Sequence, residues 1–325
     1  MSGTGAANKV ATVPDPRILI FANPIAGRGR GRELARGLRE GLAEKGYDAE
    51  VFLERPQGFE LGRLRDPEPA RAAIVIGGDG TLRGVAHRLF LDGVDTGPNP
   101  PRDGARPLGP PLLIVPLGTA NLMGRHLGIR WNRTTLVGQV AAALSRNKVV
   151  PLDTAVVNGN LFLLMAGVGF DARVVHELDR LRRGPIRIAN YITPTLLALA
   201  NYDYPPLRVV VDGRAVVEGE PAVAFVGNLP EYGTGFPILP YARGDDGVLD
   251  VCVLPCRSRV DLVRLFVLAA VGEHVNAEGV TYVKGRHVRV ESQGRAAPVQ
   301  VDGDPAGHTP ADIDLLPIRL PFIVP

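Results

Sequence analysis

The stretch Ala72-Ala73-Ile74-Val75-Ile76-Gly77-Gly78-Asp79-Gly80-Thr81-Leu82-Arg83 decides how the first half of this chain folds. An apolar, β-branched run stops at two glycines, and apolar residues then recur at helical spacing, which predicts a strand, a tight turn and a helix. Such a turn lets backbone N–H groups approach a phosphate, and the helix N-terminus adds positive partial charge. A carboxylate repels bare phosphate, so Asp79 needs a metal contact or a hydroxyl to activate. The stretch therefore favours phosphoryl transfer over passive anion binding.

For this element alone, a plain strand-to-helix turn with an aspartate near the helix start stays open as the alternative. Two better-known phosphate motifs are excluded. The sequence contains no G-x-x-x-x-G-K-[ST] loop, and the glycine-rich stretch Gly27–Arg32 has Arg32 where the dinucleotide fingerprint requires its third glycine.

Composition limits the class of protein. A chain of 325 residues with 45% hydrophobic and 22% charged residues is typical of about two ordinary globular domains. A net charge of +3 is too small to indicate a nucleic-acid partner. Cys252 and Cys256 have no matching Cys or His pair, which disfavours zinc and suits a reducing cytoplasm. Residues 1–16 lack the apolar core of a signal peptide and are expected to be a flexible tail.

The predicted secondary structure changes near Pro151 from alternating strands and helices to mainly strands. Residues 17–150 alternate strand and helix patterns, which predicts an α/β domain with a mostly parallel sheet and a proline- and glycine-rich surface excursion between Asp92 and Pro111. Residues 151–316 are dominated by strands, which predicts an antiparallel β-sandwich. The apolar segment 317–325 is expected to return to the first domain.

Turn signals mark the second half. Asn158-Gly159, Asp212-Gly213 and Asp302-Gly303 each separate β-like runs and predict tight hairpin turns. Helical patterns interrupt the strands near residues 172–199 and 259–271.

Three strands of the first domain end in small, polar, glycine-bearing loops. Besides Gly77–Thr81, the strand Ile18–Ala22 runs into Asn23-Pro24-Ile25-Ala26-Gly27, and another strand runs into Pro116-Leu117-Gly118-Thr119-Ala120-Asn121. The carboxyl ends of strands in an open α/β sheet are where ligands bind. Three such loops together indicate a binding site at this edge.

Further motifs follow in the second half: Gly167-Val168-Gly169-Phe170-Asp171, Asp246-Gly247-Val248-Leu249-Asp250 and Val301-Asp302-Gly303-Asp304. In order and spacing, the whole set resembles the diacylglycerol kinase catalytic-domain family of lipid kinases. The soluble bacterial members are the most similar, and sphingosine and ceramide kinases are related to them. The resemblance implies a Rossmann-like α/β nucleotide domain, a C-terminal β-sandwich and an active site in the cleft between them.

The resemblance also implies roles for individual residues. Asp79, Asp302 and Asp304 are the expected catalytic carboxylates, Asp79 orienting or deprotonating the acceptor hydroxyl. Asp302 and Asp304 are expected to hold Mg²⁺ or share the base role, and Asp246 to help hold a structural divalent ion. Magnesium prefers few carboxylates together with water and substrate phosphate. The expected ATP-binding residues are Asn23, Gly77, Gly78, Gly80, Thr81, Gly118, Thr119 and Asn121.

The chain departs from the family pattern at three points. Leu122 stands where the family often has an aspartate, which removes one carboxylate from the expected magnesium network. Asp304 stands where glutamate is common, so the charge is kept with a shorter reach. The stretch Leu53-Glu54-Arg55 lacks the threonine that often follows the second strand.

The sequence therefore predicts an ATP- and Mg²⁺-dependent lipid kinase that is cytoplasmic and works on a lipid substrate at the membrane surface. A kinase of NAD or another small molecule, and a nucleotide- or lipid-binding protein without catalysis, stay open as alternatives. A peripheral membrane contact is expected at the cluster Arg180, Arg182, Arg183 and Arg187, beside the apolar stretch Ile188–Tyr204; a solvated helix face is the competing interpretation. A homodimer is left open.

Overall fold

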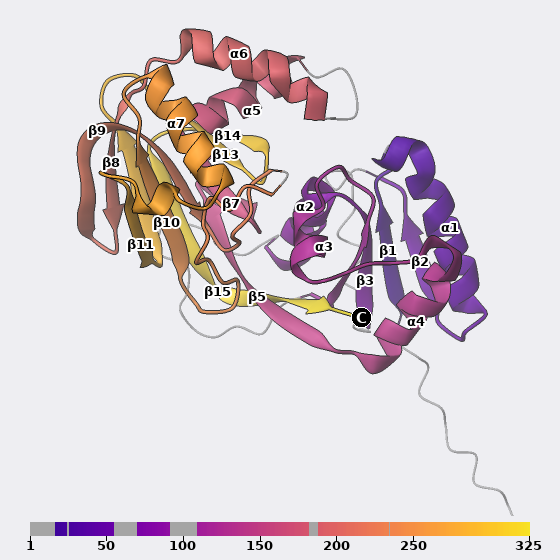
Figure 1. Ribbon diagram of the computed structural model, residues 1–325. Coiled ribbons are helices and arrows are strands. Elements are labelled where there is room, and N and C mark those ends of the chain that lie inside the picture. Colours follow the sequence, from indigo (N-terminus) through magenta and orange to yellow (C-terminus); the bar gives the residue numbers. More distant parts are fainter. Residues whose placement is uncertain (1–16, 25, 55–69, 92–108, 182–187, 234) are drawn as a thin grey trace, which may run out of the picture.

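Two long strands join an N-terminal α/β unit to a C-terminal β unit (Figure 1). Three predicted features lie wholly or largely outside the described residues: the tail 1–16, the run between Asp92 and Pro111, and the arginines at 182, 183 and 187. The computed structural model describes residues 17–24, 26–54, 70–91, 109–181, 188–233 and 235–325.

Parallel pairing builds the N-terminal sheet in the order β2-β1-β3-β4. This confirms the predicted α/β architecture. Strands β1 and β3 are buried along their whole length, as expected for apolar runs covered on both faces. The strands are β1 (Ile18–Ala22), β2 (Ala49–Phe52), β3 (Ala72–Gly77) and β4 (Leu112–Pro116).

Helices cover both faces of this sheet. Leu38 of α1 and Val140 of α4 pack on one face, and Leu82 of α2 and Met123 of α3 pack on the other. Because α1, α2 and α3 follow β1, β3 and β4, their first residues lie at the carboxyl edge of the sheet. The helices are α1 (Arg30–Ala43), α2 (Asp79–Phe90), α3 (Leu122–His126) and α4 (Leu136–Arg146).

The C-terminal unit is a β-sandwich. One layer contains β6, β5, β15, β12 and β8, and the other contains β14, β13, β7, β10 and β11. Strand β9 belongs to both, because its first half pairs with β8 and its second half pairs with β7 and β10. Side chains of both layers, such as Val209 and Val299, form one core. The strands are β5 (Val149–Val157), β6 (Asn160–Phe162), β7 (Met165–Val168), β8 (Pro206–Val211), β9 (Arg214–Gly227), β10 (Leu249–Pro255), β11 (Thr281–Gly285), β12 (His287–Ser292), β13 (Pro298–Val301), β14 (Asp304–His308) and β15 (Ala311–Ile323).

The three predicted hairpin turns are confirmed. Asn158, Asp212 and Asp302 have φ values of 49°, 48° and 49°, and the glycine after each also has a positive φ. Two left-handed residues in a row form the turn whose twist matches that of the flanking strands. The third turn joins β13 to β14 and fixes where the two carboxylates of the Asp302-Gly303-Asp304 motif point.

Strand β15 carries the chain back to the first unit. It pairs with β5 along an antiparallel ribbon, and its last residues, Phe322 and Ile323, pair in parallel with Leu112 and Leu113 of β4. The strand is continuous from residue 311, so no break separates the sandwich from the returning segment. Figure 1 shows β5 and β15 side by side between the two units.

Three helices lie on one side of the sandwich (Figure 1). The helical pattern predicted over residues 172–199 contains two of them, and the third corresponds to the pattern predicted over 259–271. Among the described residues, no helix is both long enough and apolar enough to span a membrane. The helices are α5 (Phe170–Leu181), α6 (Ile192–Asn201) and α7 (Arg259–Ala270).

Candidate active site

The loops that follow β3 and β4 touch backbone to backbone. A Cβ atom on Gly118 would lie 2.6 Å from the Cα atom of Gly78, closer than side chains pack. Glycine is therefore needed where these loops meet. The Leu117 N–H donates to the carbonyl of Gly77 at 2.8 Å and continues the strand pairing into the loops. The two predicted phosphate-binding loops thus form one surface.

The remaining predicted nucleotide-site residues border this surface. The Asn23 amide donates to the Thr81 hydroxyl at 3.5 Å, which links the loop after β1 to the loop after β3. Asn121 has a left-handed backbone, and its side chain exchanges hydrogen bonds of 2.8 and 2.9 Å with the backbone of Gly118. Thr119 is exposed between them. Three strand ends therefore converge at one sheet edge.

Asp79 ties the two loops together. Its carboxylate accepts backbone N–H groups from Leu122 at 3.0 Å and Met123 at 3.1 Å, the first two residues of α3. A carboxylate at a helix N-terminus is stabilised by the unpaired amides and the helix dipole. Burial nevertheless raises the pKa of Asp79 above its ordinary value, although these amide hydrogen bonds lower it. A more basic carboxylate is better suited to take a proton from a hydroxyl.

Leu122, the departure from the family pattern, has a structural explanation. Its side chain is buried in an apolar cluster that also contains Leu163 and Leu164 of the C-terminal unit. Its backbone N–H still serves Asp79. The position therefore contributes an apolar contact between the two units rather than a carboxylate.

Asp304 reaches the phosphate-loop surface from the other unit. Its Oδ2 atom would lie 3.4 Å from a Cβ placed on Gly80. The Arg83 guanidinium, one turn into α2, contacts the same oxygen at 2.5 Å and donates to the Val301 carbonyl at 3.2 Å. The sequence reasoning assigned no role to Arg83, and its only signal was its place directly after the glycine-rich turn.

Asp302 is bound to backbone amides of the C-terminal unit, whereas the resemblance implies that it holds Mg²⁺ or shares the base role with Asp304. Its carboxylate accepts three backbone N–H groups, from Leu163, Leu164 and Met165, at 2.8 to 3.1 Å. Burial raises its pKa to about 6, although Arg83 and the three amides lower it. Asp302 lies in the left-handed turn and Asp304 begins the next strand, so the two carboxylates point in different directions. Asp302 anchors the hairpin, and Asp304 faces α2.

Buried polar side chains joined by hydrogen bonds support the turn at Asp302-Gly303. The side-chain carbonyl of Gln300 accepts the Gly303 N–H at 2.9 Å, and its amide donates to Asp171 at 3.1 Å. The other oxygen of Asp171 is buried, and no described residue donates a hydrogen bond of good geometry to it. Burial raises the pKa of Asp171 to about 7, offset in part by backbone amides, Gln300 and Tyr232. The Gly167–Asp171 motif is thereby linked to the Asp302–Asp304 motif.

Asp246 does not fit the structural divalent-ion site that the resemblance implies. The Lys284 ammonium lies 2.9 Å from an oxygen of Asp246 and 3.2 Å from an oxygen of Asp250, and it also donates to the Tyr241 carbonyl at 3.4 Å. Although burial lowers the pKa of Lys284, the hydrogen bonds to the two aspartates raise it above its ordinary value. A protein cation thus already balances these carboxylates. Neither Lys284 nor Asp250 was singled out for this from the sequence.

Magnesium fits Asp304 better than Asp302. Among the described residues, no group of three or more His, Cys, Asp or Glu side chains is arranged to hold a metal ion. Mg²⁺ bound with a nucleotide needs only one or two carboxylates, because water and phosphate supply its other ligands. The Asp304 side chain is 37% exposed, and Arg83 contacts one of its two oxygens. Asp302 already uses its oxygens on three amides.

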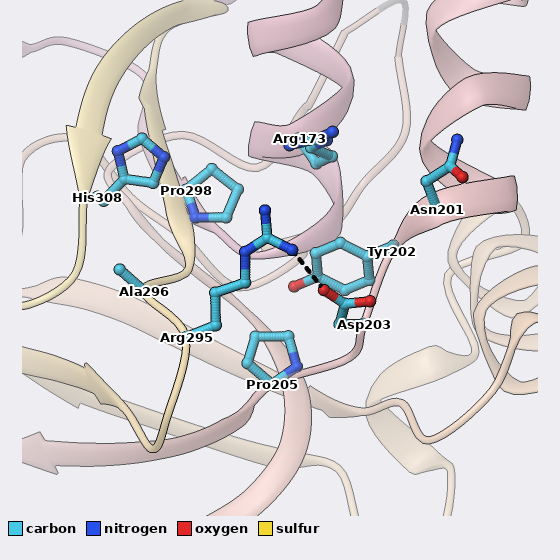
Figure 2. Close-up of a pocket in the computed structure, with 9 residues that line it drawn as sticks. All are labelled: Arg173, Asn201, Tyr202, Asp203, Pro205, Arg295, Ala296, Pro298 and His308. Carbon is cyan, nitrogen blue, oxygen red and sulfur yellow. Dashed lines mark hydrogen bonds and ion pairs between the residues drawn. The ribbon is translucent and has the colours of Figure 1, made fainter.

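A separate small pocket lies on the sandwich side (Figure 2). It is lined by the positively charged side chains of Arg173 and Arg295 and by His308, and Arg295 forms an ion pair of 2.8 Å with Asp203 at its edge. Burial is the main cause that lowers the pKa of His308, and the nearby His176, Arg173 and Arg295 lower it further. With a volume of about 70 Å³ and none of the predicted site residues in its lining, this pocket is distinct from the candidate active site.

Comparison with known families covers both units. Residues 17–157 match the family described as "Diacylglycerol kinase catalytic domain". Residues 165–324 match the "YegS C-terminal NAD kinase beta sandwich-like domain". The N-terminal unit belongs to the diacylglycerol kinase catalytic-domain family. This confirms the resemblance read from the motifs, and family membership supports a phosphotransferase.

Relatives with assigned names align with this chain over almost its whole length. A Mycobacterium tuberculosis protein named diacylglycerol kinase is 28% identical over 315 residues, which cover 95% of each chain. A Staphylococcus carnosus protein of the same name is 26% identical over 303 residues, or 91% of each chain. A crystal structure of a diacylglycerol kinase from Bacillus anthracis superposes with a TM-score of 0.67 at 24% identity, covering 96% of this chain and 97% of that one. This last likeness concerns the fold.

Proposed function

We propose that this protein is an ATP-dependent lipid kinase that transfers the γ-phosphate to a hydroxyl of diacylglycerol or a related lipid. The observation that carries the proposal is the position of Asp304. A carboxylate of the sandwich lies against Gly80 of the glycine-rich loop in the other unit, bridged by Arg83. Phosphoryl transfer needs cationic groups and aligned carboxylates around the phosphates.

The loops Gly77–Thr81 and Gly118–Asn121 would bind the phosphates of ATP. Their backbones meet without intervening side chains, and α2 begins at Asp79 with its N-terminal amides toward the same edge. Asp304 would hold Mg²⁺, which neutralises charge on the phosphates when bound. Arg83 keeps Asp304 in place and adds a positive charge beside it.

Asp79 would orient the acceptor hydroxyl and take its proton. Its two oxygens accept the amides of Leu122 and Met123, and a carboxylate has the capacity to accept further hydrogen bonds. Its raised pKa makes it a stronger base than an exposed aspartate. Asp302 would act indirectly, by fixing the hairpin that carries Asp304.

Incubation of the purified protein with γ-labelled ATP, Mg²⁺ and a panel of acceptors tests the proposal. The panel contains diacylglycerol, monoacylglycerol, sphingosine and ceramide in mixed micelles, together with NAD. Label in a lipid product, lost in the Asp304→Asn variant, is the expected result. Label in NAD alone would replace the lipid by a nucleotide acceptor. No label in any acceptor, despite ATP binding, would show a binding protein without catalysis.

A further inference from the structure

Helix α7 exposes an apolar stripe to solvent. Val260, Val263 and Val267 on the helix and Val271 directly after it are 76%, 54%, 62% and 67% exposed. Their spacing of three or four residues places them on one side of the helix. The opposite side buries Leu262, Leu265 and Ala269 in the unit's core. The exposed valines are therefore not needed to attach α7 to the sandwich.

Neighbouring helix α6 adds to this surface. Its Ile192 and Leu196 are each 61% exposed, and the Arg259 guanidinium at the start of α7 donates to the Ala200 carbonyl of α6 at 2.7 Å. Eight of the ten large exposed hydrophobic residues in the described part of the chain lie on α6, on or directly after α7, or at the end of α5. Such a concentration on one side of a protein marks an interaction surface rather than ordinary scatter.

A positive charge lies on the helix beside the stripe. Arg264 is exposed and lies four residues after Val260 and three before Val267, so it is on the valine side of α7. The acidic residue of the helix, Asp261, is occupied by the helix cap, where it accepts from the Ser258 hydroxyl at 3.0 Å and the Arg257 N–H at 3.1 Å. An exposed apolar helix face beside a basic residue suits an anionic membrane interface, which takes up apolar side chains and attracts cations.

We propose that the valine face of α7, defined as Val260, Val263, Val267 and Val271 with Arg264, docks on the anionic lipid surface that contains the substrate. This inference rests on the proposed function, since a lipid kinase without a spanning helix among its described residues must meet its substrate at an interface. A second copy of the chain suits this face less well. A two-fold contact centred on the stripe would bring the two copies of Arg264 into the same interface, and like charges disfavour that contact.

Vesicle sedimentation tests the surface without requiring turnover. The triple variant Val260→Ser, Val263→Ser, Val267→Ser removes the apolar stripe while leaving the buried side of α7 intact. We expect its binding to phosphatidylcholine vesicles that contain phosphatidylglycerol to be at least about tenfold weaker than that of the wild type, because burying each valine in the lipid interface is favourable. Val149→Ser, at an exposed valine on β5, is the matched control and should bind like the wild type.

Arg264→Gln should weaken binding about fivefold at low salt and have less effect as salt rises, since a basic residue at an anionic surface contributes about 1 kcal/mol. Unchanged vesicle binding of the triple variant, or no binding by the wild type, would overturn the proposal. So would a wild-type dimer, detected by sedimentation velocity, that the triple variant converts to a monomer.

Kinase assays separate this inference from the proposed function. The triple variant should lose activity on diacylglycerol in vesicles but keep it on a dispersed short-chain diacylglycerol. If the wild type binds vesicles through α7 but phosphorylates no lipid, the proposed function fails while the docking surface stands. If lipid phosphorylation on vesicles is the same in both proteins, the docking surface fails while the proposed function stands.

Discussion

Arg83 and Asp304 join the two units of this protein at the candidate active site, through an ion pair of 2.5 Å. Arg83 lies one turn into α2, and Asp304 begins β14 of the sandwich. The two side chains are 19% and 37% exposed, so water screens this pair only in part. The pair therefore links the glycine-rich loop to the Asp302–Asp304 hairpin.

Replacing Arg83 by methionine should lower kcat by about a hundredfold or more, the typical effect of losing a positioned charge in a transfer site. Arg83→Lys should recover only part of this, because an ammonium cannot donate to Asp304 and to the Val301 carbonyl in the same fork geometry. Steady-state kinetics with ATP and lipid varied separately would measure both effects. A methionine variant with wild-type kcat would mean that the bridge has no part in catalysis.

Asp302→Asn and Asp304→Asn should both reduce activity, but only Asp302→Asn should also reduce stability. Both are expected to lower turnover by at least about a hundredfold. Asp302→Asn should in addition lower the free energy of unfolding by about 1–3 kcal/mol, because its amide cannot accept from three backbone N–H groups and leaves donors unpaired. Asp304→Asn, at a partly exposed position, should change stability little. Urea unfolding of both variants decides this, and equal stability would contradict the anchoring role of Asp302.

Asp79→Asn should abolish phosphoryl transfer and keep the fold. The asparagine oxygen can still accept one amide at the start of α3, but its NH₂ group would face the other, so we expect a stability loss of about 1 kcal/mol. The loss of activity should exceed what this small change explains. Circular dichroism and turnover on the same preparation provide the measurement, and near wild-type turnover would remove Asp79 from the chemistry.

The sequence predicted the fold and the loops well because both depend on local patterns. The strand at Ile18–Ala22 has the predicted bounds, and the dipeptides such as Asp302-Gly303 form the predicted turns. The sequence could not predict which way Asp302 and Asp304 point, since that depends on the pairing of β13 with β7. Lys284 was missed for the same reason, because only the register of β10 with β11 places it opposite Asp250.

The buried Asp171 should make stability depend on pH. Its pKa is raised to about 7 in the folded protein, whereas an unfolded aspartate titrates near 4. The folded state therefore binds more protons between these values, and the free energy of unfolding should fall as pH rises from about 4 to about 7. Asp171→Asn, which keeps the shape without the charge, should flatten this slope and be relatively more stable at pH 8. Unfolding curves at several pH values test this, and parallel profiles of variant and wild type would refute it.

Because of Lys284, the thermal stability of the wild-type protein should not depend on a divalent metal at Asp246 and Asp250. In the wild type, neither Mg²⁺, Ca²⁺ nor a chelator should shift the thermal midpoint in the absence of nucleotide, because the ammonium already lies between the two carboxylates. Lys284→Met should lower the free energy of unfolding by about 1–3 kcal/mol, because it leaves the buried Asp250 carboxylate without a compensating charge. The loss should be smaller than for a fully buried pair, since the Lys284 side chain is 37% exposed. In this variant, with two carboxylates and the Tyr241 carbonyl left facing one another, divalent cations should recover part of the lost stability.

Arg286→Met, which removes a nearby cation bonded to the Gly247 carbonyl, is the control, and its stability should not become dependent on metal. A wild-type midpoint that falls on chelation and recovers with Ca²⁺, but not in Asp246→Asn, would instead establish a divalent ion at Asp246.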